Sequence, residues 1–278
     1  MKPSLFQRVI PLLFLGSVCV AGDLPELAKN TTGQPAPVPG EFDSLGNVAL
    51  ERLGKKQENA STEDKEKGKG TPPGTEDGKQ GTDKAVRDAD GKTAKDYFTA
   101  GALRHKMGDR DGAAAAYTRA IEMDPNYAAA YYNRACVWLA KKNYDNLISD
   151  TTKALDLGYE SKANLLCLRG TGWAGKGDFE KAVTDHNAAI TIDPSYALAY
   201  NNRGNDYYRK GEVAKAIKDC EKSIELDPSS PLPWYNRGYA YYTLKKYPKA
   251  VADWKRAIEL QPEYAAELEP LIGKVEGR

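Results

Sequence analysis

The sequence predicts an all-α solenoid of about five helix-turn-helix units followed by a C-terminal capping helix. The first observation is a recurring Asp-Pro or Gln-Pro dipeptide, whose prolines are Pro125, Pro194, Pro228 and Pro262. The last three stand 34 residues apart, and the first gap, 69 residues, is one more than twice that period. The second observation is that apolar residues between these prolines recur every three or four positions, the spacing of one helix face. The third is that all 17 tyrosines lie between Tyr97 and Tyr264, which places the folded part in that region.

The fourth unit shows how the pattern yields two helices. Tyr200, Gly204 and Tyr207 fall on one side of a first helix, which residues 210–212 interrupt with the sequence Lys-Gly-Glu. A second helix ends at Asp227, because the residue before a proline disfavours the helical conformation. The expected units are residues 94–127, 128–162, 163–196, 197–230 and 231–264, and residues 265–278 are expected to form the cap.

Two segments depart from the regular pattern. In the second unit, Leu147 replaces a small residue, Lys142 replaces the turn glycine and Tyr159 replaces the proline, so we expect looser packing there. In the cap, Leu268 contributes to an apolar side, and the helix requires Pro270 to occupy its first turn, where proline is tolerated.

The repeating residues resemble those of the tetratricopeptide repeat (TPR) family, as found in exported bacterial proteins. In the fourth unit the matching residues are Tyr200, Gly204, Tyr207, Gly211, Ala216, Ser223 and Pro228. In the fifth they are Trp234, Gly238, Tyr241, Ala250, Trp254, Ala257 and Pro262. The resemblance covers residues 94–264 and implies a right-handed α-solenoid that binds proteins. It also implies that the first helices of the units line a concave groove for an extended peptide or a partner helix.

The groove positions implied by the resemblance carry mainly tyrosine and asparagine. These candidate partner-binding residues are Tyr132, Asn133, Asn201, Asn202, Asn205, Tyr208, Tyr235, Asn236, Tyr239 and Tyr242. Tyrosine offers broad apolar contact with a polar tip, and one amide offers both a donor and an acceptor to a peptide main chain. Three of the asparagines recur one residue before an arginine, although Leu168 breaks that row in the third unit.

Arginines form a second row, Arg134, Arg169, Arg203 and Arg237. Two interpretations of this row stay open: the arginines contact a ligand, or they brace adjacent helices. The family's carboxylate clamp for chaperone C-termini is not expected, because Phe98, Ala102 and Leu168 occupy positions that the clamp requires to be polar.

The sequence gives no sign of catalysis, of a metal site or of a cofactor. It has two histidines, no Cys-x-x-Cys pair, and none of the common nucleophile, phosphate-loop or zinc motifs. We expect His186 to be a packed core residue. The formal net charge of +1 argues against a nucleic-acid partner, which would favour a basic surface. We therefore expect a non-enzymatic scaffold whose ligand is a protein or a peptide.

The first 21 residues have the layout of a signal peptide: Lys2 and Arg8 precede an apolar stretch from Val9 to Val20. A retained membrane anchor and a lipid-modified Cys19 are the alternatives. We expect an exported protein of the periplasm or cell envelope, with a membrane contact only through such an anchor. Residues 22–93 contain one aromatic residue, Phe42, and are expected to be a disordered linker.

Several points stay open at this stage. Cys136 and Cys167 lie on successive first helices, so either a disulfide or two buried thiols is possible. Alternative functions are an envelope-anchored, lipoprotein-type assembly factor, or an accessory to a glycosyltransferase-like enzyme. The sequence does not identify the partner or the oligomeric state.

Overall fold

A computed structural model describes residues 87–277, and eleven α-helices with one short 3₁₀ turn, but no strand, occur within that range. The first pair is α3 (Ala94–Lys106) with α4 (Arg110–Met123), and the second is α5 (Ala128–Ala140) with α6 (Tyr144–Asp156). The third is α7 (Lys162–Gly175) with α8 (Phe179–Ile192), the fourth α9 (Ala197–Arg209) with α10 (Val213–Leu226), and the fifth α11 (Pro231–Thr243) with α12 (Tyr247–Leu260). The turn η3 (Pro262–Tyr264) and α13 (Ala265–Glu276) follow. The all-α solenoid of helix pairs is confirmed.

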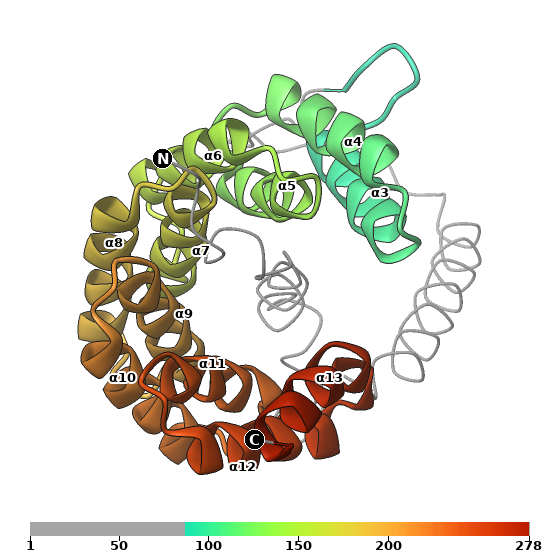
Figure 1. Cartoon of the computed structure of the whole chain (residues 1–278). Helices are drawn as coiled ribbons and strands as arrows, with labels where there is room; N and C mark the ends of the chain where they lie inside the picture. Colours follow the sequence, from blue (N-terminus) through green and yellow to red (C-terminus); the bar gives the residue numbers. More distant parts are fainter. Residues whose placement is uncertain (1–86, 278) are drawn as a thin grey trace, which may run out of the picture. The chain divides into compact units, whose positions relative to one another are not determined.

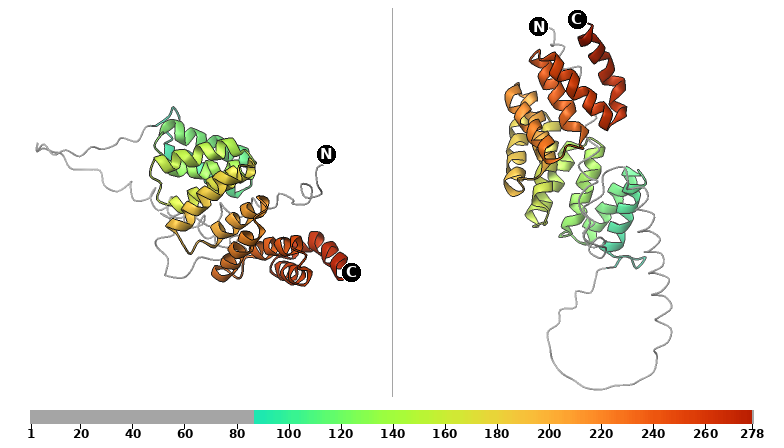
Figure 2. Two further views of the ribbon diagram at one scale, coloured as in Figure 1. Left: turned by 60° about the vertical axis from the view of Figure 1, so that its left-hand side comes forward. Right: turned by 90° about the horizontal axis from the view of Figure 1, so that it is seen from below.

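The helices form two rows. In Figure 1 the first helices of the pairs, α3, α5, α7, α9 and α11, lie on the inner side, and the second helices lie on the outer side. Each helix packs on the next one in the chain, and successive inner helices also touch. Figure 2 shows the same sequential stacking from two other directions. Each pair therefore depends on its neighbours for a buried core.

Where the two helices of the first, third and fifth pairs cross, a small residue on the inner helix faces a large side chain on the outer helix. A Cβ added to Gly101 would lie 2.7 Å from the ring of Tyr117, and one added to Gly170 would lie 2.7 Å from the ring of His186. The side chain of Trp254 covers Gly238 in the same way. A glycine in the inner helix thus makes room for a ring from the outer helix, which explains the small residues that recur in the sequence.

In each turn between paired helices one residue adopts the left-handed backbone conformation, with a positive φ. Gly177 and Gly211 provide it with φ values of 84° and 83°. Lys142 and Lys245 occupy the same position in the second and fifth pairs, with φ values of 57° and 58°. The turn is therefore retained at Lys142, although that side chain makes the left-handed conformation less favourable.

The second pair is not loosely packed, so this expectation was wrong. Leu147 is fully buried in a hydrophobic core cluster, because Gly172 on α7 leaves space for it: a Cβ on that glycine would collide with Cδ2 of Leu147. Tyr159, which stands in place of the proline, stacks on Tyr132 with ring centroids 5.1 Å apart. The unusual residues of this unit are matched by changes in their neighbours.

The cap forms, but not as expected at its proline. Leu268 and Ile272 of α13 are buried against the fifth pair. Pro270 lies inside α13 and not in its first turn, because the helix already begins at Ala265, directly after η3.

The expected signal peptide and residues 22–86 of the expected linker lie outside the described residues. The last residues before α3 contact that helix. Asp88 accepts a 2.5 Å hydrogen bond from the hydroxyl of Tyr97, and Thr93 caps α3 through a reciprocal pair of bonds with Asp96.

Candidate functional site on the inner helices

The ten candidate residues all lie on inner helices, but in two separate places. Tyr132 and Asn133 belong to α5, and α7 stands between them and the others. On α9 lie Asn201, Asn202, Asn205 and Tyr208, and on α11 lie Tyr235, Asn236, Tyr239 and Tyr242. The structure thus brings eight of the candidates together at the α9–α11 contact.

Amides link three successive inner helices. Asn236 donates from Nδ2 to Oδ1 of Asn201 at 2.9 Å, and Asn201 donates to Asn202 at 3.2 Å. Asn202 in turn donates to Oγ1 of Thr171 on α7 at 3.3 Å. Asn201 is only 1% exposed, so its amide serves these contacts between helices. Asn205 and Asn236 are half-buried and reach the surface.

The row of asparagines that directly precede the arginines is interrupted in the third pair. Asn133 is half-buried and donates to the carbonyl of Ala129 in its own helix, and Leu168 is fully buried at the corresponding place in the third pair. The amides that reach the surface therefore concentrate at the fourth and fifth pairs.

The tyrosines of α11 are fixed by the cap. The hydroxyls of Tyr235 and Tyr239 both donate to Oε1 of Glu267 on α13, each at 2.7 Å. Burial, followed by these bonds, raises the pKa of both tyrosines. Tyr208 has its hydroxyl 3.0 Å from Oγ1 of Thr243, which joins α9 to α11. No pattern in the sequence points to Glu267, because one acidic residue in a capping helix resembles any solvated side chain.

A small depression opens between α9, α10 and α11, with about 310 Å³ of space including its open mouth. Its lining consists of Gly204, Asn205, Tyr208, Ala216, Cys220, Tyr235, Asn236 and Tyr239. Five of these eight residues were candidates from the sequence. The other three, Gly204, Ala216 and Cys220, are its buried small residues. None of the described residues that line the depression is an Asp, Glu, Lys, Arg or His.

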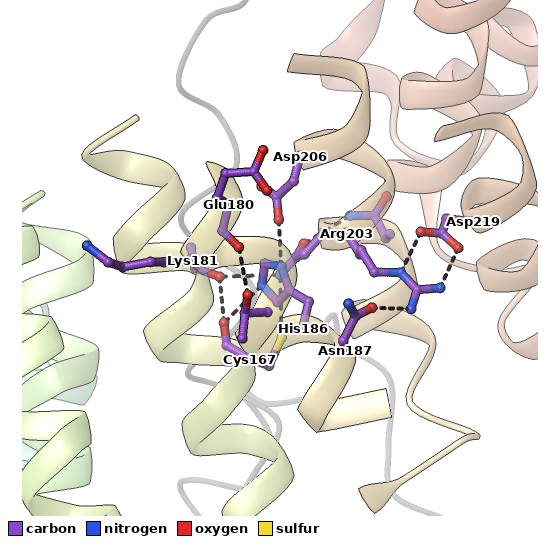
Figure 3. Close-up of polar contacts among 12 residues, drawn as sticks. Cys167, Glu180, Lys181, His186, Asn187, Arg203, Asp206 and Asp219 are labelled. Carbon is purple, nitrogen blue, oxygen red and sulfur yellow. Dashed lines mark hydrogen bonds and ion pairs between the residues drawn. The ribbon is translucent and has the colours of Figure 1, made fainter. Parts of the chain in front are cut away.

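The arginine row braces helices. Each of the four arginines of this row, on an inner helix, donates two parallel hydrogen bonds of 2.7–2.9 Å to an aspartate of its outer helix. The pairs are Arg134–Asp150, Arg169–Asp185, Arg203–Asp219 and Arg237–Asp253. Arg203 also reaches Oδ1 of Asn187 on the preceding outer helix at 2.7 Å, as Figure 3 shows. The signal for these pairs was in the sequence: every aspartate follows its arginine by 16 residues, and Ala100 and Ala116 replace both partners in the first unit.

A second polar contact, between His186 and Asp206, is fully buried in the core. His186 is 1% exposed, with Nδ1 2.7 Å from Oδ2 of Asp206 and Nε2 3.2 Å from the carbonyl oxygen of Cys167. Figure 3 shows the ring between these two acceptors. Burial alone lowers the pKa of His186, but the bonds to Asp206 and Cys167 outweigh it and raise the pKa to about 10. The ring is therefore an imidazolium paired with a carboxylate, and it belongs to the core.

Metal-binding clusters, membrane-spanning helices and disulfides are absent from the described residues. Within residues 87–277 no group of three or more His, Cys, Asp or Glu side chains could hold a metal ion. In the same range no helix is both long and apolar enough to cross a bilayer. Cys136, Cys167 and Cys220 are free, buried thiols, so the disulfide alternative is not realised.

Comparison with known proteins agrees with this geometry. The family model "TPR repeat" matches residues 101–140, 175–211 and 204–245, and the model "Tetratricopeptide repeat" matches residues 231–264. Tetratricopeptide repeat protein 6 of Homo sapiens is 36% identical over 89 residues, covering 32% of this chain and 17% of that protein. Serine/threonine-protein phosphatase 5 of Rattus norvegicus is 31% identical over 132 residues, covering 45% of this chain and 23% of the phosphatase. The chain thus spans less than a quarter of the length of either relative.

Solved structures share the arrangement of the helices. The structure described as YrrB, a TPR protein with an unusual peptide-binding site, has a TM-score of 0.50 and 25% identity, covering 64% of this chain and 91% of that one. A structure of MamA has a TM-score of 0.51 and 26% identity, covering 60% and 96%. The family models, the curated relatives and the solved structures together support one family for the helical array of this chain, the tetratricopeptide repeats.

Proposed function

We propose that this chain is a non-enzymatic protein-interaction module that holds an extended segment of a partner protein along its inner helices. One observation carries this proposal: the α9–α11 contact presents half-buried amides and tyrosines around a depression without charged side chains. TPR proteins mediate protein–protein interactions, and the YrrB structure is described as having a peptide-binding site.

The chemistry of this face suits a peptide main chain. Asn205 and Asn236 are half-buried amides, and each amide carries both a donor and an acceptor. Tyr208 and Tyr242 are half-buried rings that give contact area at a low cost in side-chain entropy. Main-chain recognition of this kind depends little on the ligand's sequence, so the partner's identity must come from additional contacts. With 40 basic and 39 acidic residues, the chain has no charge excess that would favour nucleic acid.

Site-specific photo-crosslinking tests this assignment. A photoreactive p-benzoylphenylalanine replaces Tyr208 on α9 of the full chain. In a matched control it replaces Lys222 of the outer helix α10, whose side chain is 38% exposed. Cells that express each variant are irradiated, and the adducts are identified by mass spectrometry. We expect a defined adduct from position 208 and none from position 222. Equal adducts from both positions, or adducts only from position 222, would contradict binding along the inner helices.

We also propose that the protein works outside the cytoplasm, in the periplasm or cell envelope. The support is the signal-like segment of residues 1–21, with Lys2 and Arg8 before an apolar stretch. Mass spectrometry of the mature N-terminus in a cell fraction is the test. A free Gly22 indicates cleavage and export, and an acylated Cys19 indicates a lipoprotein-type assembly factor. An intact Met1 in the cytoplasmic fraction would refute export.

A further inference from the structure

Lysines at the ends of three inner helices form ion pairs between successive helix pairs. Each lysine ends its inner helix, and its partner is the second residue of the outer helix in the preceding pair. The ion pairs are Lys141–Asp111, Lys176–Asp145 and Lys210–Glu180. The turns of the first four pairs are therefore joined by contacts in which every one of these lysines has a counter-charge from its own chain.

This series of ion pairs stops between the fourth and fifth pairs. The equivalent residues there are Leu244, which ends α11, and Ala214, the second residue of α10. Leu244 is 42% exposed, and Ala214 is exposed as well. An exposed apolar residue thus stands where the other boundaries have a lysine paired with a carboxylate.

The leucine is accompanied by lysines that lack a counter-charge. Residues 241–250, which lead from α11 into α12, contain Lys245, Lys246 and Lys249 but no Asp or Glu, whereas the corresponding turn of every other pair contains an acid. All three lysines are exposed, and within residues 87–277 none of them forms an ion pair. Glu212 in the neighbouring turn is already paired with two other lysines. We call Leu244, Lys245, Lys246 and Lys249 the basic patch.

We infer that the basic patch binds an acidic stretch of the partner segment that the inner helices hold. One aliphatic residue of that stretch packs on Leu244, and the Asp or Glu residues beside it pair with the lysines. The inference rests on the proposed function and adds the chemistry of the partner to it. The partner's carboxylates supply the counter-charge that Asp111, Asp145 and Glu180 supply at the other boundaries. The aliphatic contact removes exposed apolar surface from water.

The basic patch continues the candidate face of α9 and α11. The hydroxyl of Tyr208 lies 3.0 Å from Oγ1 of Thr243, the residue directly before Leu244. Asn236 and Leu244 are eight positions apart along α11, which corresponds to about 12 Å. An extended peptide covers that distance with about four residues. One extended segment therefore reaches both the amides of the candidate face and the basic patch.

Two variants of the patch and one control test this inference. Lys245→Gln with Lys246→Gln removes two charges and keeps long polar side chains. Leu244→Lys with Ala214→Asp rebuilds the ion pair of the other boundaries, which removes the apolar centre and places a competing carboxylate in the patch. The matched control, Lys153→Gln with Lys274→Gln, removes two exposed lysines from α6 and α13. Circular dichroism and thermal unfolding establish that each variant is folded.

The experiment is an NMR titration of the full, isotope-labelled chain, which detects weak binding. The probe is a synthetic peptide with the sequence Gly-Ser-Glu-Glu-Leu-Glu-Glu-Ser-Gly. One comparison peptide has glutamine in place of every glutamate, and another has serine in place of the leucine. We expect the probe to shift the backbone amide signals of Lys245 and Lys246 in wild type, and to bind the control variant equally well. We expect binding about 3–30-fold weaker in both patch variants, weaker binding of both comparison peptides, and weaker binding at high salt.

Three results would overturn the inference. The first is a comparison peptide that binds as tightly as the probe, and the second is a patch variant that binds the probe as tightly as the control variant does. The third comes from vesicles of phosphatidylcholine and phosphatidylglycerol. If they sediment wild type but not the Lys245→Gln, Lys246→Gln variant, while the probe shifts no signal, the patch binds anionic lipid and not a peptide.

The failure of this inference is distinct from that of the proposed function. If crosslinks from position 208 form but the probe does not bind, the inner helices hold a partner that has no acidic stretch at the basic patch. If no crosslink forms from position 208, the proposed function itself fails.

Discussion

Nδ1 of His186 lies 2.7 Å from Oδ2 of Asp206, across the boundary between the third and fourth helix pairs. The equivalent positions at the boundary between the first and second pairs hold Tyr117 and Val137, which belong to one apolar core cluster. A buried ion pair thus replaces an apolar contact at one junction of an otherwise repeating core. This pair and its apolar counterpart in the same chain allow a controlled test of what the ion pair contributes.

Breaking the pair should destabilise the chain more than replacing it. Asp206→Val leaves the imidazolium of His186 without a counter-charge, and His186→Phe leaves the carboxylate without one, so each single change should cost about 3–5 kcal/mol. The double variant reproduces the Tyr117–Val137 type of contact and should come within about 1 kcal/mol of wild type, or exceed it. Urea unfolding of all four proteins measures this. A double variant that loses the sum of the two single effects would show that the two residues are not coupled.

Stability should also depend on pH through this pair. The pKa of His186 is raised from about 6.5 to about 10, so the folded chain holds that proton more tightly than the unfolded one. Its stabilisation is complete below about pH 6.5 and is lost as the pH rises through 10. The charges of Lys210 and Arg209 also act on Asp206. Relative to the double variant, wild type should lose stability by at most about 1.4 kcal/mol per pH unit between pH 7 and 10. Urea midpoints at several pH values test this, and a constant difference would contradict it.

Replacing the two turn lysines by glycine should stabilise the folded chain. Lys142 and Lys245 have φ values of 57° and 58°, where a side chain is disfavoured and glycine is not. A side chain in the left-handed conformation costs about 1–2 kcal/mol, so Lys142→Gly and Lys245→Gly should each stabilise the chain by about 1 kcal/mol. Lys141→Gly is the control, because Lys141 has a φ of −90° and gains nothing from glycine. The midpoints of thermal unfolding of the three variants test this. Equal shifts of the midpoint for the variants at 141 and 142 would refute the conformational explanation.

Leu147 and Gly172 should behave as a coupled pair. Leu147→Ala opens a cavity in the core cluster of the second and third pairs and should cost about 2–5 kcal/mol. Gly172→Ala should be destabilising in wild type, because its Cβ collides with Cδ2 of Leu147, and less destabilising in the Leu147→Ala background, where the contact with Ile148 at 2.9 Å remains. Gly273→Ala on α13 is a matched control, since a Cβ there meets nothing within 4 Å. It should stabilise the helix by about 0.5–1 kcal/mol. Additive effects at 147 and 172 would contradict the coupling.

Some of the candidate site could be found from sequence and some could not. Asn205, Tyr208, Tyr235, Asn236 and Tyr239 line the depression because their places in the repeat put them on the inner helix face, which is a local property. The amides of Asn201 and Asn202 instead join neighbouring helices, and this depends on residues about 35 positions away. One sequence shows that a position faces inward, but it does not show whether the next unit covers it.

The sequence by itself determined the fold class of the repeat region, because helical spacing, turn residues and a 34-residue period are local and act the same way in every unit. Only the tertiary structure decided which side chains of the inner helices remain available to contact a ligand. In the folded chain the four arginines of the row form ion pairs with aspartates, His186 pairs with Asp206, and two tyrosines donate hydrogen bonds to Glu267 in the cap. The tertiary structure also left a small depression between α9, α10 and α11, which Asn205 and Asn236 help to line. The physical reason is that burial and pairing depend on how the side chains of adjacent units fit together, and that fit is set by packing between residues far apart in the chain.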